Sequence, residues 1–519
     1  ALSHGVAATR LSDAAAATWI LRGDETWRRR DRDVTSTWRR VAAAATWIFR
    51  RDKSRRHPGT HRARTRCARR ARTPVRPRRA VMSSRAWIIA VLASRQAAAL
   101  APAAGFKSIC SGPHPNDASA ALDEALTLLA LTRGADAPTP DLAVLTVGLP
   151  LEASFESLVD EAFERTGARV LVGVLGAGVL GGGQERELAP CVAVAAGTLP
   201  PGSEVAPFSL AGDVAADPRR HRETERLLKR PGTACLLLGD PFSPIADAAA
   251  LVDEILPASP VVGGISCPSA PDKPSLAVRQ KGTVVATPPG SVVGLALSGP
   301  RLAMHALTAQ GAAGVGPTYL VTEAPADHIV ATLDGEPAVT RLREALSDVV
   351  KSDPRVAELL KNALLVGLRK KGSADDNFLV RQVRGATSDG MLLVGDPSIV
   401  AGETELRFHV RDDVAARQDL DAILARYALE KSFAGATATP LLSFLVSCGG
   451  RGEGLFGESG TDSKAFADAN DAPVVGFFAN GELGPVGARI PSGDARIPTH
   501  LHGFTATCGV LLDTGGDEE

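Results

Sequence analysis

Short apolar runs and amphipathic stretches alternate along residues 105–513, and they recur three times in the same order. Each set begins with an apolar run of strand length, continues with a stretch of helical period and returns to an apolar run interrupted by glycine. A connection and a last strand then follow. The expected strand–helix–strand–loop–strand units cover 141–199, 233–297 and 441–512, with helices at 154–166, 246–255 and 463–469.

Each of the three units contains a related short motif, namely Arg-Val-Leu-Val-Gly, Ser-Pro-Val-Val-Gly-Gly or Ala-Pro-Val-Val-Gly. A strand that returns parallel through a helix makes a right-handed crossover, and hairpins add antiparallel pairs. The pattern therefore predicts an α/β to α+β protein with mixed sheets covered by helices. We expect two domains, at 105–305 and 315–513, and an acidic tail at 514–519.

The most distinctive stretch is 441–457, where an apolar run ends in the thiol of Cys448 and Gly449, Gly450, Arg451 and Gly452 follow. Successive backbone N–H groups in such a turn form a concave anion site, and a guanidinium offers a planar fork to carboxylate or phosphate. We predict ligand binding at these five residues with Arg451 as the anchor; its alternative role is a clamp on loop carbonyls. A lowered pKa would make Cys448 a nucleophile or redox sensor, and its alternative is a buried, hydrophobic thiol.

Three further positions complete the predicted ligand site. Gly481 and Glu482 lie in a glycine-rich loop at 481–485, where a carboxylate opposite an arginine would bind a ligand amine. The alternative for Glu482 is an acceptor that stabilises a turn. His502 is able to accept a proton or to ligate haem iron, and its alternative is a packed, hydrogen-bonded residue. His500 is expected to face the other side of its strand.

Composition separates the first part of the chain from the rest. Residues 1–85 hold 23 of the 58 Lys and Arg but 6 of the 58 Asp and Glu, and almost no aliphatic side chains lie between 49 and 79. We interpret 1–81 as a disordered basic extension that is not part of the mature protein. Residues 82–104 are compatible with a signal or transit peptide and with an ordinary N-terminal helix, and a cytoplasmic or plastid location depends on which of the two they form. The remainder is acidic, so no nucleic-acid partner is expected, and neither a membrane span nor a metal site is predicted.

A series of short motifs follows in order along the C-terminal half of the chain. They are Asp334-Gly-Glu-Pro-Ala338, Asn377-Phe-Leu-Val-Arg381, Phe408-His-Val-Arg-Asp412, Ser447-Cys-Gly-Gly-Arg-Gly452, Gly476-Phe-Phe-Ala-Asn-Gly-Glu-Leu-Gly-Pro485 and Leu501-His-Gly-Phe-Thr505. These motifs resemble those of the FIST C domain, and 120–300 is similar to the FIST N domain. The resemblance implies a sensory module for small ligands, proposed to include amino acids; some relatives are said to bind haem, and one combines the domains with an F-box in a ubiquitin ligase. No F-box pattern is found in 1–104.

Three functions are compatible with these residues. The first is a sensory, signal-transducing protein that binds an amino acid or another small anion, with no cofactor. The second is a protein-interaction module that acts as a substrate receptor in ubiquitin-dependent degradation. The third is an enzyme that uses Cys448 and His502.

Overall fold

The computed structural model describes residues 105–515, except 212–217, 231, 284, 286, 353, 360–363, 374–376, 396–398, 435–437 and 492–494. The expectations for 1–81 and 82–104 lie outside the described residues, as does most of the acidic tail. The strands form four sheets, and three of these are built to one plan.

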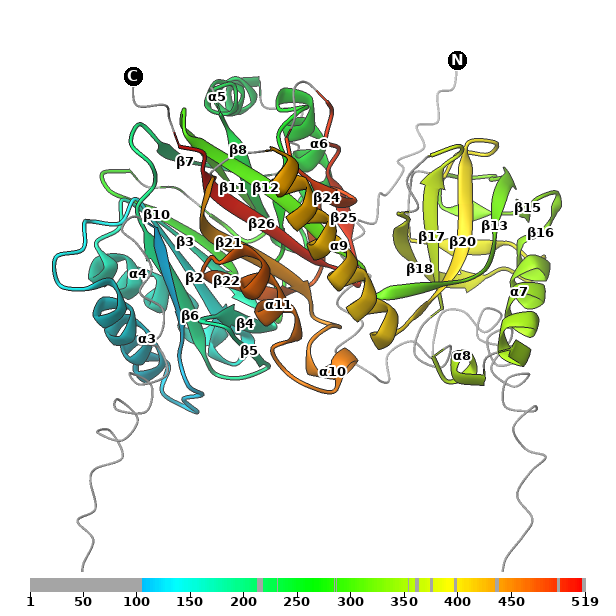
Figure 1. Cartoon of the computed structure of the whole chain (residues 1–519), viewed down its shortest axis with the longest axis horizontal. Helices are drawn as coiled ribbons and strands as arrows, with labels where there is room; N and C mark the ends of the chain where they lie inside the picture. The colour runs from blue at the N-terminus through cyan, green and yellow to red at the C-terminus, as the bar shows by residue number, and fades with distance from the viewer. Residues whose placement is uncertain are drawn as a thin grey trace, which may run out of the picture. The chain divides into compact units, whose positions relative to one another are not determined.

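The first copy of this plan forms the sheet β1-β6-β2-β3-β10. Strands β2 and β3 are parallel, whereas β6 runs antiparallel to both β1 and β2. Two helices, α3 and α4, lie side by side on one face of the sheet, and their apolar residues pack against it (Figure 1). The elements are β1 Phe106–Cys110, α3 Ala118–Arg133, β2 Leu142–Gly148, a 3-10 turn at Leu149–Ser154, α4 Phe155–Thr166, β3 Val170–Gly176, β4 Gly178–Gly181, β5 Gln184–Glu187 and β6 Val192–Gly197.

The second copy repeats this arrangement in the sheet β25-β23-β9-β8-β11-β7. Strands β8 and β9 are parallel, and β11 is antiparallel to β8 and β7. Its helices pack on the apolar face that contains β8 and β9. The elements are β7 Glu204–Ala211, α5 Pro218–Leu228, β8 Ala234–Gly239, α6 Ile245–Ile255, β9 Val261–Ile265, β10 Leu276–Gln280 and β11 Ser291–Ser298.

The third copy forms the sheet β24-β12-β26-β21-β22-β4-β5, covered by α9 and α11 (Figure 1). Again the helix-linked strands, β21 and β22, are parallel, and β26 is antiparallel to β21 and β12. The elements are β12 Leu302–Ala309, α9 Asp413–Ala434, β21 Thr439–Cys448, α10 Glu453–Phe456, α11 Thr461–Asn470, β22 Val474–Ala479, β23 Glu482–Gly484, β24 Gly487–Arg489, β25 His500–His502 and β26 Ala506–Asp513.

A fourth sheet is inserted between β12 and α9 of the third copy, and we call residues 312–411 the insert. It has eight strands in the order β14-β19-β18-β17-β20-β13-β15-β16 and its own apolar core. The elements are β13 Ala312–Glu323, β14 Ile329–Val330, β15 Thr332–Leu333, β16 Glu336–Pro337, α7 Ala338–Ser352, α8 Pro354–Leu359, β17 Leu364–Lys370, β18 Leu379–Ala386, β19 Leu392–Val394 and β20 Thr404–Arg411.

The three copies exchange strands in a closed cycle. The connection before β11 contributes β10 to the sheet of the first copy, where it pairs with β3. The first copy contributes β4 to the third, where it pairs with β22, and the third contributes β23 to the second, where it pairs with β9. Each copy therefore completes the sheet of another, and one core is shared by all three sheets.

The predicted fold class is confirmed, including the repeated unit, but two connections are misjudged. The segment 481–485 was expected to be a loop, whereas Glu482–Gly484 is a strand. The repeated unit predicts a loop before its last strand, whereas the connection before β11 contains the strand β10 at Leu276–Gln280. Both strands pair with a different copy, so the local pattern that predicts hairpins within one unit does not reveal them.

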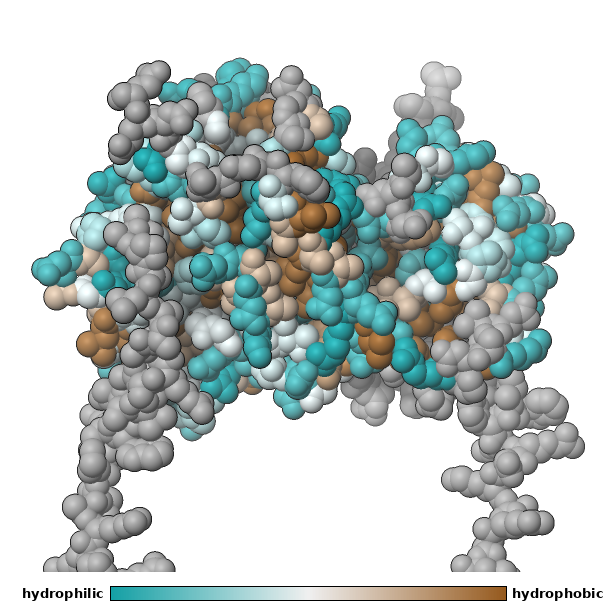
Figure 2. Space-filling model, viewed as in Figure 1, coloured by the Kyte–Doolittle hydropathy of each residue, from teal (hydrophilic) through white to brown (hydrophobic). Residues whose placement is uncertain are grey.

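Large exposed apolar side chains are scattered over the described chain, on helices and in loops. Figure 2 shows hydrophilic side chains over most of the face in view, with apolar atoms in small groups between them. Scattered apolar residues of this kind are normal on soluble surfaces and do not indicate a docking site. The side chains are Leu131, Leu188, Phe242, Val400, Val414 and Leu429.

Candidate functional site

A ring of three hydrogen bonds joins the copies where their second parallel strands end. The N–H groups of Ala177, Cys267 and Asn480 occupy equivalent positions after β3, β9 and β22. Each donates to a backbone carbonyl of the next copy, respectively that of Phe478, Leu175 and Ile265, at 2.9 Å. Ligand sites commonly form outside the carboxyl ends of parallel strands, because loops rather than strands meet there.

A cavity of about 500 Å³ opens at this ring. Ala177, Cys267 and Asn480 all line it, together with segments from every copy and from strand β18 of the insert. Its apolar wall includes Ala246, Ala249, Leu379, Leu483, Leu501 and Phe504.

Basic side chains predominate among the charged groups of the cavity wall. Arg381 and Arg384 come from β18, and Arg496 comes from the segment before β25. Two carboxylates also line the wall, and both already accept hydrogen bonds. Asp253 accepts from the N–H and hydroxyl of Thr499 at 2.7 and 2.6 Å, and Glu187 accepts from the N–H of Glu453 at 2.6 Å. Three guanidinium groups thus face two carboxylates, and the wall has an excess of positive charge that favours an anion.

His502 lines the cavity, and its ring contains a buried acceptor atom without a described partner. Its Nε2 lies 3.0 Å from the carbonyl oxygen of Gly484, so Nε2 carries the proton and Nδ1 is the acceptor. Nδ1 has no hydrogen-bond partner among the described residues, although His502 is only 4% exposed. Burial, with smaller contributions from His500 and Arg381, lowers the pKa of His502 to about 3, which keeps the ring neutral.

The expectation that His500 faces away from His502 is wrong. Both residues line the cavity, and their ring centroids are 6.1 Å apart. The reason is the period of a β-strand, in which residues two apart share a face.

The loop after Cys448 is not the open anion nest that the sequence predicts. The N–H of Gly449 donates to Ala479 O at 2.8 Å, and that of Arg451 donates to Cys448 O at 2.8 Å. These donors are satisfied within the protein, so the loop shapes the cavity wall rather than offering free N–H groups.

The expected lowering of the Cys448 pKa is also contradicted. Burial, reinforced by the nearby Glu482 carboxyl, raises the pKa of Cys448 to about 12. His502, the partner of the enzyme hypothesis, hydrogen-bonds to Gly484 instead. A thiol with this pKa remains protonated at neutral pH, so the hydrophobic-thiol alternative fits better than a thiolate nucleophile.

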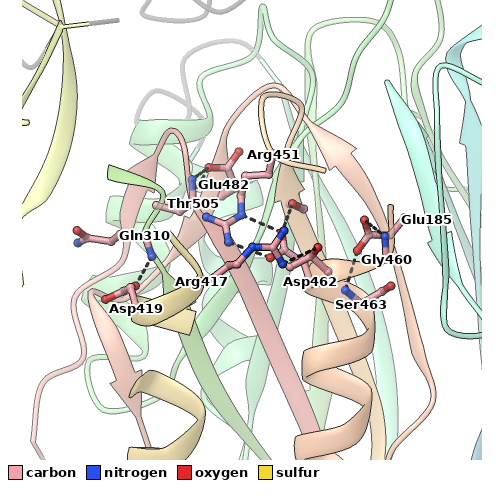
Figure 3. A network of polar contacts seen from close by, with 12 residues as sticks. Glu185, Gln310, Arg417, Asp419, Arg451, Gly460, Asp462, Ser463, Glu482 and Thr505 are labelled. Carbon is pink, nitrogen blue, oxygen red and sulfur yellow. Dashed lines mark hydrogen bonds and ion pairs between the residues drawn. The ribbon is translucent and has the colours of Figure 1, made fainter. Parts of the chain in front are cut away.

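Arg451 belongs to a buried ion pair outside the cavity wall (Figure 3). Its Nε and Nη2 donate to the two carboxylate oxygens of Asp462, each at 2.8 Å, and Ser447 Oγ also donates to Asp462 at 2.8 Å. Both charged side chains are 1% exposed. The clamp alternative therefore describes Arg451 better than the ligand anchor, although its acceptor is a carboxylate on α11 rather than loop carbonyls.

Glu482 is likewise directed into the protein and does not line the cavity. Its Oε2 accepts from the hydroxyl and the N–H of Thr505 at 2.8 and 3.2 Å (Figure 3). Glu482 is fully buried, and burial raises its pKa to about 8. A neutral, enclosed carboxyl does not bind a ligand amine. The predicted role of Glu482 in amino-acid binding is therefore not supported.

The raised pKa of Glu482 predicts a pH-dependent stability difference from the Glu482→Gln variant. The protonated carboxyl fits the folded state, so its stabilisation is complete below pH 4.5 and is lost as the pH rises through about 8. Between pH 5 and 9, native protein should lose about 4 kcal/mol relative to the variant. Urea unfolding at several pH values measures this difference. A stability difference that is independent of pH would contradict this expectation.

Carboxylates from the first copy satisfy the glycine-rich segment of the third. Glu185 of β5 accepts from the N–H groups of Gly460 and Ser463 at 2.8 and 2.7 Å at the start of α11 (Figure 3). Glu187, two residues on, holds the N–H of Glu453. A Cβ on Gly452 would lie 2.2 Å from the Glu187 carboxylate, which explains the glycine at this position. Gly452 therefore contacts an internal anion.

The cavity contains some of the predicted site residues but not others. Cys448, Gly449, Gly450, Gly481 and His502 line it, whereas Arg451, Gly452 and Glu482 do not. Sequence reasoning missed the basic residues of the wall. Arg381 was predictable from the sequence, because it is the last residue of the family motif Asn377-Phe-Leu-Val-Arg381. Arg384, Arg496 and Asp253 belong to no recognised motif.

Two family models match the chain. Residues 141–336 match the FIST N domain and 338–485 match the FIST C domain. The chain belongs to the FIST family. An uncharacterized protein of Mycobacterium tuberculosis (strain H37Rv) is 29% identical over 399 residues, covering 72% of this chain and 92% of the relative. An uncharacterized protein of Mycobacterium bovis is 30% identical over 287 residues, covering 54% of this chain and 67% of the relative. FIST domains are generally sensory.

The described residues do not form a site that fits a metal ion or haem. Among them, no three His, Cys, Asp or Glu side chains are grouped in a way that would hold a metal ion. Haem does not fit His502, because Nε2 is engaged with Gly484 O and the ring is almost fully enclosed. No helix in the described part of the chain is long and apolar enough to cross a membrane.

Proposed function

We propose that this FIST protein is a sensory, signal-transducing protein that binds a small organic anion in the cavity at the ring. The observation that carries the proposal is the set of three arginines on the wall of a cavity to which all three copies contribute. Arginine is well suited to carboxylates because its guanidinium donates two parallel hydrogen bonds.

The size and composition of the cavity support a small ligand. Sites for small molecules are usually concave, largely apolar and equipped with a few polar groups, and volumes of about 300–1,000 Å³ are typical. The cavity has a volume of about 500 Å³ and a wall rich in alanine and leucine. Its basic groups lie on β18 and on the segment before β25. A bound anion would contact several copies and the insert at once. Binding would therefore be able to change how these parts pack against one another.

Thermal unfolding of the full chain with a panel of small carboxylates tests this function. Binding to the folded state alone stabilises a protein by about 2.7 kcal/mol when the ligand is at 100 times its Kd. At least one carboxylate should therefore raise Tm, and the Arg381→Gln variant should need at least about tenfold more ligand for the same shift.

The matched control is Arg369→Gln on the same inserted sheet. Arg369 pairs with Glu405 at 2.7 Å and does not line the cavity, so its loss should leave the ligand dependence unchanged. A panel without any stabilisation would contradict the proposed function and favour the protein-interaction alternative.

A further inference from the structure

Five residues other than glycine have a positive φ in the described part of the chain. Three of them are Asn116, Asp334 and Asp471, whose short polar side chains tolerate the left-handed conformation. The other two are large and apolar, namely Leu188 with a φ of 47° and Phe504 with a φ of 67°. Both of these line the cavity at the ring. The two least favourable backbone conformations of this kind therefore occur at one site.

Hydrogen bonds fix the backbone at both residues. The N–H of Leu188 donates to the carbonyl oxygen of Ala177, a residue of the ring, at 2.9 Å. Directly after Phe504, the N–H and the hydroxyl of Thr505 donate to Glu482 Oε2 at 3.2 and 2.8 Å. Strained residues persist where the surrounding structure fixes them, and they are concentrated at ligand sites. Glycine would adopt either conformation without strain, so backbone stability does not explain a leucine and a phenylalanine here.

Neither side chain contributes to an apolar core. Leu188 is 57% exposed, Phe504 is partly exposed, and none of the apolar clusters of the described residues includes either of them. Leu188 is also the one large exposed apolar side chain of the described residues that lines the cavity. The apolar surface of both residues is thus available to a ligand, and its removal from water would favour binding in proportion to its area.

The charge of the cavity wall matches a ligand with one negative group. Its three guanidinium groups carry one charge more than its two carboxylates. We propose that the cavity binds a monocarboxylate with an apolar tail, with the carboxylate at the wall arginines and the tail against Leu188 and Phe504. This inference rests on the proposed anion-binding function and names the ligand class. Leucine and phenylalanine supply an apolar contact that glycine does not, which explains their presence in a conformation that favours glycine.

Isothermal titration of the full chain with acetate, butyrate and hexanoate tests the inference. The three acids have the same charge and differ in the number of methylene groups. Each methylene group that is buried against the protein should tighten binding up to about fourfold, so hexanoate should bind at least about tenfold more tightly than acetate. 1-Hexanol, which has a similar tail without the charge, should bind more weakly than hexanoate.

The outcomes separate the ligand class from anion binding. Equal binding of the three acids would overturn the inference while leaving anion binding intact. Binding of 1-hexanol as tight as that of hexanoate would overturn the carboxylate contact. Absence of binding by all three acids would also overturn the inference, and the wider panel of carboxylates then tests anion binding by itself.

The Leu188→Gly variant assigns the tail contact to a strained residue. It should lose at least about fivefold in affinity for hexanoate and keep its affinity for acetate within about twofold. Without ligand its Tm should rise by about 1–3 °C, because relief of the left-handed strain exceeds the entropy that glycine adds to the unfolded chain. The Phe504→Gly variant should change these three quantities in the same directions.

The matched control is Leu429→Gly on α9. Leu429 is 56% exposed but lies in a helix outside the cavity. Glycine destabilises a helix interior, so this variant should have a lower Tm and bind both acids as native protein does. Hexanoate affinity that survives both Leu188→Gly and Phe504→Gly would contradict the tail contact, and a lower Tm of Leu188→Gly would contradict the strain.

Discussion

Replacement of Arg451 by alanine is expected to lower the free energy of unfolding by about 3–5 kcal/mol. Removing one partner of a buried ion pair leaves the other charge uncompensated, and the effect is usually of this size. Asp462 would keep the hydroxyl of Ser447 but lose both guanidinium bonds in a setting where it is 1% exposed. Denaturant unfolding followed by circular dichroism measures the loss.

The control for Arg451→Ala is Arg426→Ala on α9. Arg426 pairs with Glu430 at 2.7 Å, but it is 53% exposed, so its loss should change stability by less than about 0.5 kcal/mol. If Arg451 were a ligand anchor, the variant would keep its stability and lose only ligand binding. A stable Arg451→Ala protein would therefore refute the structural role assigned to this pair.

Replacement of Gly476 by alanine is expected to destabilise the protein by at least about 3 kcal/mol. Gly476 lies opposite Leu445 in the parallel β21–β22 pair, and a Cβ at this position would lie 1.6 Å from the Leu445 carbonyl oxygen. Backbone atoms on both sides would have to shift, and both strands belong to the core shared by the three sheets. Gly263 of the second copy meets Leu237 O at 1.8 Å in the same way.

Gly454→Ala is the matched control, because a Cβ there has no neighbour within 4 Å. Its free energy of unfolding, measured with urea, should stay within about 0.5 kcal/mol of the native value. Equal stability of the Gly476 and Gly454 variants would show that the glycine of the repeated Val-Gly motif is not required by strand packing.

The repeated glycine also shows why so much of the fold is predictable. Close approach of the parallel strands requires glycine at the same place in the second and third copies, at Gly263 and Gly476. The shared architecture therefore explains why the two copies have a similar motif although the rest of their sequences differs. The parallel pairs and the helices between them follow from local pattern. The cyclic exchange of β4, β10 and β23 does not follow from local pattern. The sequence of a strand does not indicate whether the strand pairs within its own copy or with another copy.

The candidate site is less predictable because its groups are brought together across the chain. Arg451 and Asp462 are close in sequence, yet nothing in a glycine-rich loop indicates that the arginine turns inward rather than toward a ligand. Glu185 and Glu187 meet the third copy from more than 260 residues away. Arg381 and His502 share the cavity only because the insert places β18 beside β25.

A crystal structure of the full chain grown with a carboxylate that raises its Tm tests the central claim most directly. The account predicts density for the ligand in the cavity at the ring, with its carboxylate at Arg381. A carboxylate bound only on the protein surface, or a cavity without ligand at concentrations that saturate binding in solution, would contradict it.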